Sequence, residues 1–358
     1  MVLPSADSKK NMNKKKKKIS VSKVWFFAAG AISWLLLISA LHYWLNFDHG
    51  SKKIVLMGYM PVITNLAAPL LDHASSENEG IHFKALKFSS FAEMAEALRH
   101  DEIQAAFMIA PLAVVLHQQN EDVKIVYVGN RHESSLVARK ELNIRRLSDL
   151  RGKTVAVPLR YSGHNLSMQK LMEERGLTGQ INIVELNPPD MSSALIAGSL
   201  DAYYVGEPFA AQTLKNGTAS LVYHVEDVWE SFICNLVLVK QSLIESEPEA
   251  VRMLVEGAVR SGLWAERHPH QAAKIAAHYW NQSVDLVEYA LTEPVGRIIY
   301  DQFVPKEEEM QEIADLMLHF KLIDNNNITG LVDDQFTRSV PRDPIENLGD
   351  IFRPDKHF

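Results

Sequence analysis

The chain has 358 residues, of which 47% are hydrophobic, 23% charged and 8% aromatic, a composition typical of a globular protein. This composition excludes a disordered, collagen-like or polytopic membrane protein. The single cysteine, Cys234, excludes an intramolecular disulfide framework, a cysteine-based zinc site and an iron–sulfur cluster, so no cofactor or metal is expected.

The net charge of −7 is divided unevenly along the chain. Residues 1–23 contain eight lysines, including the run Lys14 to Lys18, against the single acidic residue Asp7. The rest of the chain carries 29 Lys and Arg against 43 Asp and Glu. An acidic body repels nucleic-acid phosphates, so nucleic acid is not expected as a partner.

An uncharged segment follows the lysines, with no Asp, Glu, Lys or Arg from Val24 to Phe47. A helix of about 22 residues is roughly 33 Å long, enough to cross a hydrocarbon core of about 30 Å. By the positive-inside rule, residues 1–23 are then a basic cytoplasmic tail, residues 24–46 a transmembrane anchor, and the body is exported to the periplasm or outside the cell.

A cleaved secretory signal is the alternative interpretation of residues 24–46, with the body secreted to the periplasm. Only the weak sequence Ile38-Ser39-Ala40 resembles a cleavage site, and the apolar segment exceeds the usual length of about 7–15 residues. No cysteine follows the segment closely, which excludes lipoprotein processing.

The body begins near Lys52 with short apolar runs that alternate with helical patterns. Strands are predicted at residues 53–58, 81–88, 105–109 and 123–128, and helices at 66–73, 91–99 and 111–119. This order is typical of a parallel sheet covered by helices on both faces.

A second block of the same kind follows, and then a helical region. Strands are predicted at residues 134–139, before Pro158, at 181–186, 201–205 and 232–239, and helices at 165–175, 192–198 and within 248–320. Residues 341–358 are polar and hold three prolines, which predicts a loose C-terminal tail.

Two α/β blocks predict a bilobal protein with two mixed or mainly parallel sheets and a hinge, preceded by the N-terminal transmembrane helix. Residues 52–136 and 240–335 form lobe 1 and residues 137–239 form lobe 2, with the strands near 134–139 and 233–239 as hinge segments. A ligand is then expected in the cleft at the carboxyl ends of the strands.

Several stretches of the body resemble the exported solute-binding proteins of ABC importers, in the nitrate/bicarbonate, sulfonate and taurine group, which share a periplasmic-binding-protein-like fold. They are Leu-Ser-Asp-Leu-Arg-Gly-Lys-Thr-Val-Ala-Val-Pro at 147–158, residues 187–202, Val-Gly-Glu-Pro-Phe at 205–209 and Gly-Tyr-Met-Pro-Val at 58–62. The likeness covers roughly residues 52–330. It implies a monomeric receptor that captures a small anionic solute and hands it to an ABC permease without catalysis.

The loop between Pro158 and the next helix is the first candidate for the ligand site. Backbone N–H groups and the helix dipole favour an anion there, and Gly163 permits close approach. Arg160 could clamp a carboxylate or sulfonate bidentately, and a protonated His164 would add charge. The resemblance to nitrate- and bicarbonate-type members places His164 at the ligand. Alternatively, Ser162 or Asn165 is only a helix cap, and Arg160 and His164 are solvated loop residues.

Other candidates lie outside this loop. Thr64 and Asn65 precede a predicted helix, where they can cap it, donate to a ligand, or do both. Met108 ends a strand where the family usually has smaller or hydroxyl residues, so the cleft wall becomes apolar and a purely inorganic anion is disfavoured. Tyr203 and Tyr204 alternate in a strand, so one of them, taken as Tyr204, faces the cleft.

Glu207 is a carboxylate at the expected mouth of an anion site. It can bind an amine of the ligand, hold a cation that accompanies the anion, or pair with a lysine across the hinge.

An enzyme is not expected, because the chain has no Gly-x-Ser-x-Gly elbow, phosphate-binding P-loop or His-Glu-x-x-His motif. Cys234 lies in an apolar strand pattern and is expected to be inert. Two alternatives stay open. One is a membrane-anchored ligand sensor with a separate transducer, and the other is a protein that binds or synthesises thiamine pyrimidine precursors.

Overall fold

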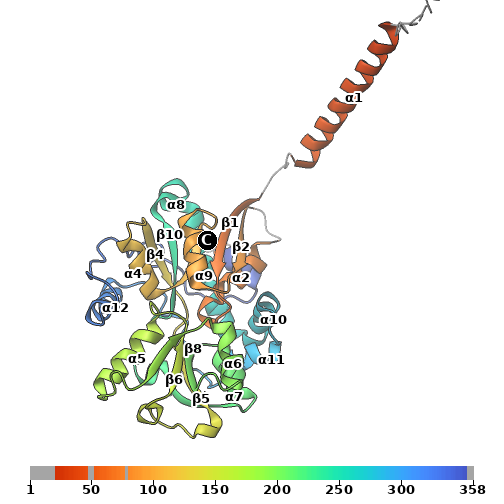
Figure 1. The fold of residues 1–358 in the computed structure, drawn as a ribbon. Helices are drawn as coiled ribbons and strands as arrows, with labels where there is room; N and C mark the ends of the chain where they lie inside the picture. The colour runs from red at the N-terminus through yellow and green to blue at the C-terminus, as the bar shows by residue number, and fades with distance from the viewer. Residues whose placement is uncertain (1–20, 47–51, 77–79, 353–358) are drawn as a thin grey trace, which may run out of the picture. The chain divides into compact units, whose positions relative to one another are not determined.

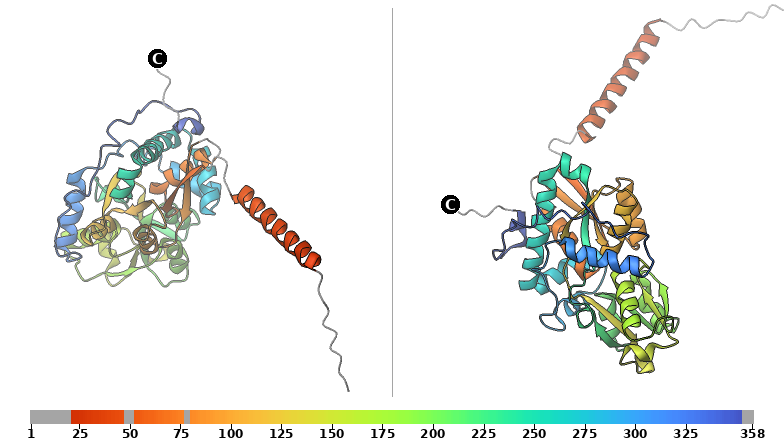
Figure 2. Two further views of the ribbon diagram at one scale, coloured as in Figure 1. Left: turned by 90° about the horizontal axis from the view of Figure 1, so that it is seen from above. Right: turned by 90° about the vertical axis from the view of Figure 1, so that its left-hand side faces the viewer.

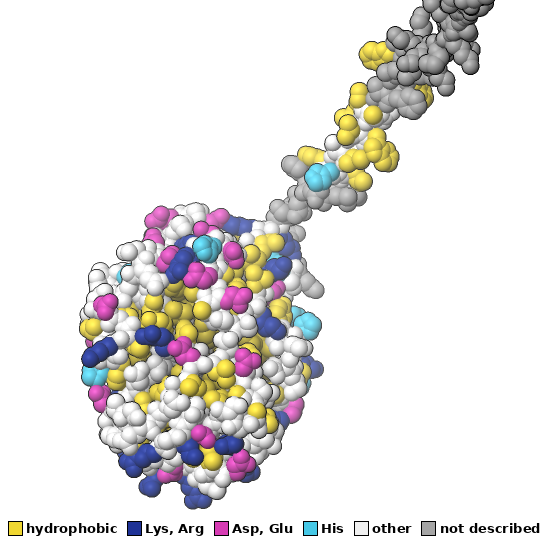
Figure 3. All heavy atoms as spheres, viewed as in Figure 1, with side chains coloured by type: hydrophobic (Ala, Val, Ile, Leu, Met, Phe, Trp, Pro, Cys, Tyr) yellow, Lys and Arg dark blue, Asp and Glu magenta, His cyan; other side chains and the backbone are white. Residues whose placement is uncertain are grey.

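The computed structural model describes residues 21–46, 52–76 and 80–352, and the chain divides into two units, residues 1–51 and residues 52–358. In the first unit, the helix α1 (Val21–Asn46) has mainly hydrophobic side chains over its described part (Figure 3). Among the described residues, no helix is found that is both long enough and apolar enough to cross a membrane. The anchor at residues 24–46 therefore stays a prediction, and residues 1–20 of the tail lie outside the described residues.

The second unit contains two five-stranded mixed sheets, as predicted. The strands of the first sheet run in the order β2-β1-β3-β10-β4. They are β1 (Lys53–Tyr59), β2 (Ile81–Lys87), β3 (Ala105–Ile109), β10 (Asn235–Lys240) and β4 (Val123–Val128). Strand β1 pairs in parallel with β2 and β3, whereas β10 is antiparallel to β3 and β4.

The second sheet repeats this arrangement in the order β7-β6-β8-β5-β9. Its strands are β7 (Asn182–Glu185), β6 (Thr154–Val157), β8 (Ala202–Gly206), β5 (Ser134–Arg139) and β9 (Ala219–His224). Here β5 is antiparallel to β8 and β9. The chain passes from β4 to β5 and returns from β9 to β10, so each sheet takes its antiparallel strand from a segment that crosses between the sheets.

Helices cover the sheets and form two lobes, each built on one sheet (Figure 1). Those near the first sheet are α2 (Ala67–Ser75), α3 (Phe91–Arg99), α4 (Ala110–Gln118), α8 (Gln241–Ser246) and α9 (Pro248–Arg267). Those of the second sheet are α5 (Gly163–Glu174), α6 (Pro188–Ile196) and α7 (Phe209–Lys215). The α9 helix buries the apolar stripe Val251, Leu254, Val255 and Ala258, which explains its place against the core.

Three further helices follow α9: α10 (Pro269–Trp280), α11 (Val284–Thr292) and α12 (Glu307–His319). The helix α11 contacts α7 of the second lobe, while α10 contacts α2 of the first. Helix α12 contacts both α4 and α5, and the right-hand view of Figure 2 shows it at the level where the lobes meet. The C-terminal helices therefore contact both lobes.

The prediction of a loose tail from residue 341 is wrong for residues 345–352. Ile345, Leu348 and Ile351 are buried, and the short 3₁₀-helix η5 (Leu348–Phe352) contacts α2 and α9. The Phe352 ring stacks on Phe83 with the ring centroids 5.5 Å apart. Apolar residues at a spacing of three lie on one face of a 3₁₀-helix, a pattern that the prolines of this segment obscure.

Candidate functional site

The two crossover segments, residues 129–133 and 225–234, lie side by side between the sheets. The His132 Nε2 hydrogen-bonds the Glu230 carbonyl (3.2 Å), and Gly129 donates its N–H to the carbonyl of Asn235 at the start of β10 (3.0 Å). A methyl group on Gly129 would clash with the Thr64 carbonyl oxygen. Glycine is therefore needed for the close approach of the first-lobe loop to the crossover.

Arg131 lies in the first crossover, is only 2% exposed, and hydrogen-bonds both the second crossover and α12. Its Nη1 donates to the Ser231 carbonyl (3.2 Å), its Nε to the Gln302 carbonyl (3.2 Å) and its Nη2 to Glu309 Oε2 (2.8 Å). The guanidinium thus has acceptors from three separate parts of the chain, as a buried charge requires.

Arg297 forms a second buried ion-pair centre. Its Nε donates to Glu226 Oε1 (2.7 Å), its Nη2 to the Ser134 carbonyl (2.6 Å), and its Nη1 lies 3.7 Å from Glu207 Oε1. Of the roles considered for Glu207, the structure shows an ion pair, but with this arginine instead of a lysine.

The carboxylate of Glu207 is buried and accepts two further hydrogen bonds, from Ala211 N–H (2.6 Å) and the Ser135 hydroxyl (3.1 Å). Burial raises the pKa of Glu207 to about 7, although Arg297 and these donors oppose the shift. Burial also raises the pKa of Glu133, whose Oε2 accepts the Glu207 N–H at 3.0 Å. Burial therefore raises the pKa of two neighbouring carboxyl groups in this region.

His164 is 2% exposed and lies in the first turn of α5. Its Nε2 hydrogen-bonds the Ser134 hydroxyl (2.9 Å), while Tyr204 and Phe232 meet its ring edge to face at 5.2 and 5.5 Å between centroids. Burial lowers the pKa of His164 to about 3, so the ring is neutral at neutral pH. This corrects the expectation of a charged or solvated His164. Its buried Nδ1 has no hydrogen-bond partner among the residues that the structure describes.

Thr64 and Asn65 belong to the 3₁₀-helix η1 (Ile63–Asn65) in the first lobe. Neither caps α2, whose N-cap is Leu66 and has no side-chain cap bond. The Asn65 amide donates to the Met60 carbonyl (3.0 Å) and accepts from Asn235 Nδ2 (2.8 Å). The buried Thr64 hydroxyl has no hydrogen-bond partner in residues 21–46, 52–76 and 80–352.

The loop that contains Thr64 also touches the second lobe directly. Ile63 donates its N–H to the Glu207 carbonyl (2.8 Å), so η1 and the turn after β8 are joined by one backbone hydrogen bond.

The other predicted residues of the α5 loop have structural contacts. The Ser162 hydroxyl accepts the Asn165 N–H (3.2 Å), which confirms Ser162 as the N-cap of α5. A methyl group on Gly163 would meet the Phe232 ring at 2.7 Å. Arg160 is exposed and lies 4.9 Å from the Tyr161 ring centroid. It does not join the buried cluster.

The last two predicted residues are part of the core. Met108 is buried in β3. The Tyr204 hydroxyl lies 3.3 Å from the Ser167 hydroxyl, and the Tyr203 hydroxyl donates to the Phe209 carbonyl (2.9 Å). Both tyrosines are fully buried, and their rings contact different helices, Tyr203 at α7 and Tyr204 at α5. The placement of Tyr204 at the ligand stays a prediction.

A cavity of about 420 Å³ is lined by segments of both lobes. The lining residues are Pro61, Lys87, Phe88, Ser89, Glu93, Pro189, Phe209, Trp280 and Gln282. Pro61 and Phe88 follow the carboxyl ends of β1 and β2, while Pro189 and Phe209 lie on α6 and α7. This is the position in which a parallel α/β sheet is expected to hold a ligand.

Sequence reasoning named none of these nine residues as ligand contacts. The ends of the first two predicted strands could have indicated four of them, Pro61, Lys87, Phe88 and Ser89. No local sequence pattern indicates that Trp280, at the end of α10, lines the cavity.

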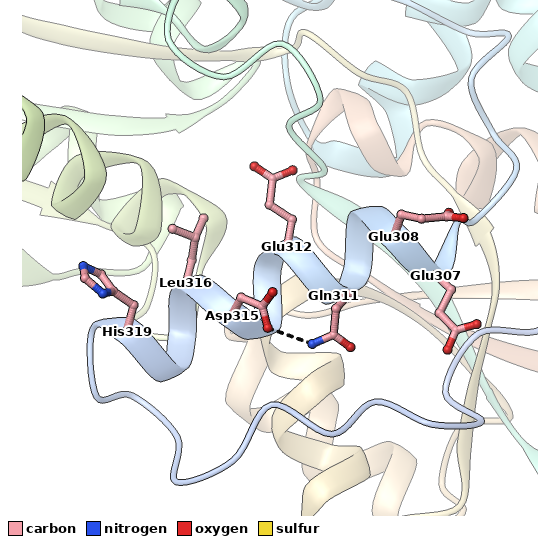
Figure 4. A pocket seen from close by; sticks show the side chains of 7 residues that line it. All are labelled: Glu307, Glu308, Gln311, Glu312, Asp315, Leu316 and His319. Atoms are coloured by element: carbon pink, nitrogen blue, oxygen red, sulfur yellow. Dashed lines mark hydrogen bonds between the residues drawn. The ribbon is translucent and has the colours of Figure 1, made fainter.

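A larger cavity of about 700 Å³ runs along α12 and is lined by that helix alone (Figure 4). Its residues are Glu307, Glu308, Gln311, Glu312, Asp315, Leu316 and His319. Four of the seven are acidic, so this groove disfavours an anion. It also lacks a lining residue from either sheet.

Two mixed α/β lobes, two crossovers and a cavity lined from both lobes define a bilobal solute-binding protein. The chain belongs to the NMT1-like family, which it matches over residues 50–279. A Bacillus subtilis (strain 168) protein named as an aliphatic sulfonates-binding protein is 26% identical over 74% of this chain and 80% of its own length. The taurine-binding periplasmic protein of Escherichia coli (strain K12) is 26% identical over 52% of this chain and 59% of its own length.

The fold is also found among solved structures. The ligand-binding component of an ABC-type import system from Staphylococcus aureus, solved with zinc bound, superposes with a TM-score of 0.73 at 20% identity. The match covers 82% of this chain and all of that one. These two relatives and this neighbour are named as ligand-binding proteins, and none of the three is named as an enzyme.

Replacing Glu207 by glutamine tests the buried carboxyl. The folded chain keeps a proton that the unfolded chain loses between about pH 4.5 and pH 7. The stability contributed by Glu207 is therefore full below about pH 4.5 and is lost as the pH rises through 7. The free energy of unfolding of Glu207→Gln minus that of the wild type should rise with pH over this window and level off above it.

Urea unfolding of the full chain at several pH values measures this difference. Taking the difference cancels the opposite contribution of His164, whose lowered pKa makes stability rise with pH between about 3 and 6.5. Glu308→Gln, at an exposed site, serves as the control and should give a flat difference. A flat or falling curve for Glu207→Gln would contradict the assignment.

Glu309→Gln tests the ion pair with Arg131. The change leaves a buried guanidinium without its carboxylate, so we expect a loss of about 3 kcal/mol in the free energy of unfolding. Glu308→Gln, one residue earlier on the same helix, should cost less than about 0.5 kcal/mol. Equal, small effects of the two changes in urea unfolding would show that Arg131 does not depend on Glu309.

Proposed function

We propose that this protein is the substrate-binding component of an ABC importer, which captures a small anionic solute between its lobes and passes it to a membrane permease. The observation that carries the proposal is the cavity lined from both lobes in a member of a solute-binding family. The names of the relatives favour sulfonates and taurine as the kind of solute.

The crossovers are suited to act as the hinge between the lobes. In the described part of the chain, the connections from β4 to β5 and from β9 to β10 cross between the two sheets. A change in their dihedral angles would rotate one lobe against the other. The hydrogen bond from Ile63 to Glu207 would then belong to the closed arrangement. A permease could distinguish the loaded receptor by this closure.

Local donors favour an anion although the body is acidic. Lys87 lines the cavity, and two buried polar atoms between the lobes, Thr64 Oγ1 and His164 Nδ1, have no hydrogen-bond partner within the described part of the chain. A buried polar group without a partner costs about 1–3 kcal/mol, which a bound acceptor or donor offsets. We propose Thr64, Asn65 and His164 as a second set of contacts that a solute reaches when the lobes open.

Calorimetry on the full chain tests the proposal. Nitrate, bicarbonate, taurine, ethanesulfonate and a thiamine pyrimidine precursor are titrated in turn, after denaturation and mass spectrometry have identified any solute that copurifies. At least one anion should bind at micromolar concentration and raise the melting temperature, because ligands that bind only the folded chain stabilise it. If none of them binds and nothing copurifies, the receptor function is wrong.

We propose further that residues 24–46 hold the body at a membrane. The supporting features are the uncharged run from Val24 to Phe47, the preceding lysines, and exposed apolar side chains of α1 such as Trp25 and Leu36. On extraction of cell membranes with alkaline carbonate, the full chain should stay in the pellet, and a chain without residues 21–46 should not. A full chain released into the supernatant would contradict the anchor.

A further inference from the structure

We infer that the solute of the 420 Å³ cavity is an organic anion with a flat apolar body, whose charged group lies at Lys87 and the indole N–H of Trp280. This inference rests on the proposed function and specifies its substrate class. The main residues that determine specificity would then lie at the end of β2 and at the end of α10, and not in the α5 loop.

The walls of the cavity are mainly apolar and flat. Five of its nine residues are proline or aromatic: Pro61, Phe88, Pro189, Phe209 and Trp280. Three of the five carry aromatic rings, and they come from different elements. Such surfaces gain free energy by covering apolar area, about 25 cal/mol for each Å², and they stack on planar groups.

The volume of the cavity also favours an organic solute. Ligand pockets for organic molecules begin at about 300 Å³, whereas a water molecule occupies about 30 Å³. A bare inorganic anion of a few water volumes would leave most of the 420 Å³ unfilled. It would leave the aromatic walls without contacts.

The anionic group has a defined pair of donors. Among the described residues that line the cavity, Lys87 is the only cationic one, and its Nζ lies 3.5 Å from the Trp280 carbonyl. The Trp280 side chain is 3% exposed, and its Nε1–H has no hydrogen-bond partner among the described residues. The indole can only donate, and a carboxylate or sulfonate oxygen of the solute is the acceptor that we assign to it.

Glu93 limits the charge of the solute. It also lines the cavity and is exposed, and no hydrogen bond or ion pair is found for its side chain among the described residues. A second negative charge on the solute would be repelled by this carboxylate. The cavity is therefore suited to a monoanion.

Matched pairs of anions test the inference by calorimetry on the full chain: benzenesulfonate against methanesulfonate, and benzoate against acetate, with nitrate as the inorganic reference. The aromatic member of each pair should bind at least about tenfold more tightly, because it covers the apolar walls. Equal binding within both pairs, or tighter binding of nitrate, would overturn the inference and leave the proposed function standing. Absence of binding by every anion tested would overturn both.

Variants locate the charged group. Trp280→Phe keeps a ring and removes the N–H, and Lys87→Met removes the cation; each should weaken benzenesulfonate binding about tenfold. Lys84→Met, at an exposed lysine of the same strand outside the cavity, should leave binding unchanged. Because Trp280 is buried, the exposed Lys87 provides the variant that does not depend on core packing. Unchanged affinity in Lys87→Met would overturn the placement of the anion.

Discussion

The arrangement of the two lobes depends on pairing the charges buried where the chain crosses between the sheets. Burying a guanidinium costs several kcal/mol unless acceptors surround it. Arg131 and Arg297 each find a carboxylate and at least one carbonyl from distant parts of the chain. The crossovers, α12 and the loop before Arg297 can therefore move apart only if these groups lose their partners.

This constraint separates the structural charges from those available to a solute. Glu207 receives two hydrogen bonds and an arginine, and His164 is neutral between aromatic rings, so neither offers a free charge at neutral pH. Lys87 lies in the cavity lined from both lobes. An acidic body can thus bind an anion locally, through one lysine and neutral donors, without a general positive field.

Local patterns made most of the fold predictable, and long-range contacts limited the rest. The apolar face of residues 91–99 predicted α3 at its observed bounds, because amphipathic periodicity is a property of the segment itself. Strand β9 and helix α7 were not predicted, and buried η5 was mistaken for a tail. In the site, His164 and Glu207 were identified, but their partners lie 30 and 90 residues away in the sequence. Contacts between residues so far apart in the sequence cannot be predicted from the local spacing of residues.

Hydrogen exchange of the full chain, with and without the tightest-binding anion, tests the central claim that the solute lies between the lobes. The account predicts slower exchange in segments of both lobes that line the cavity, residues 88–93 and 189–209, and in the crossovers. Protection confined to one lobe, or to the groove along α12, would contradict it.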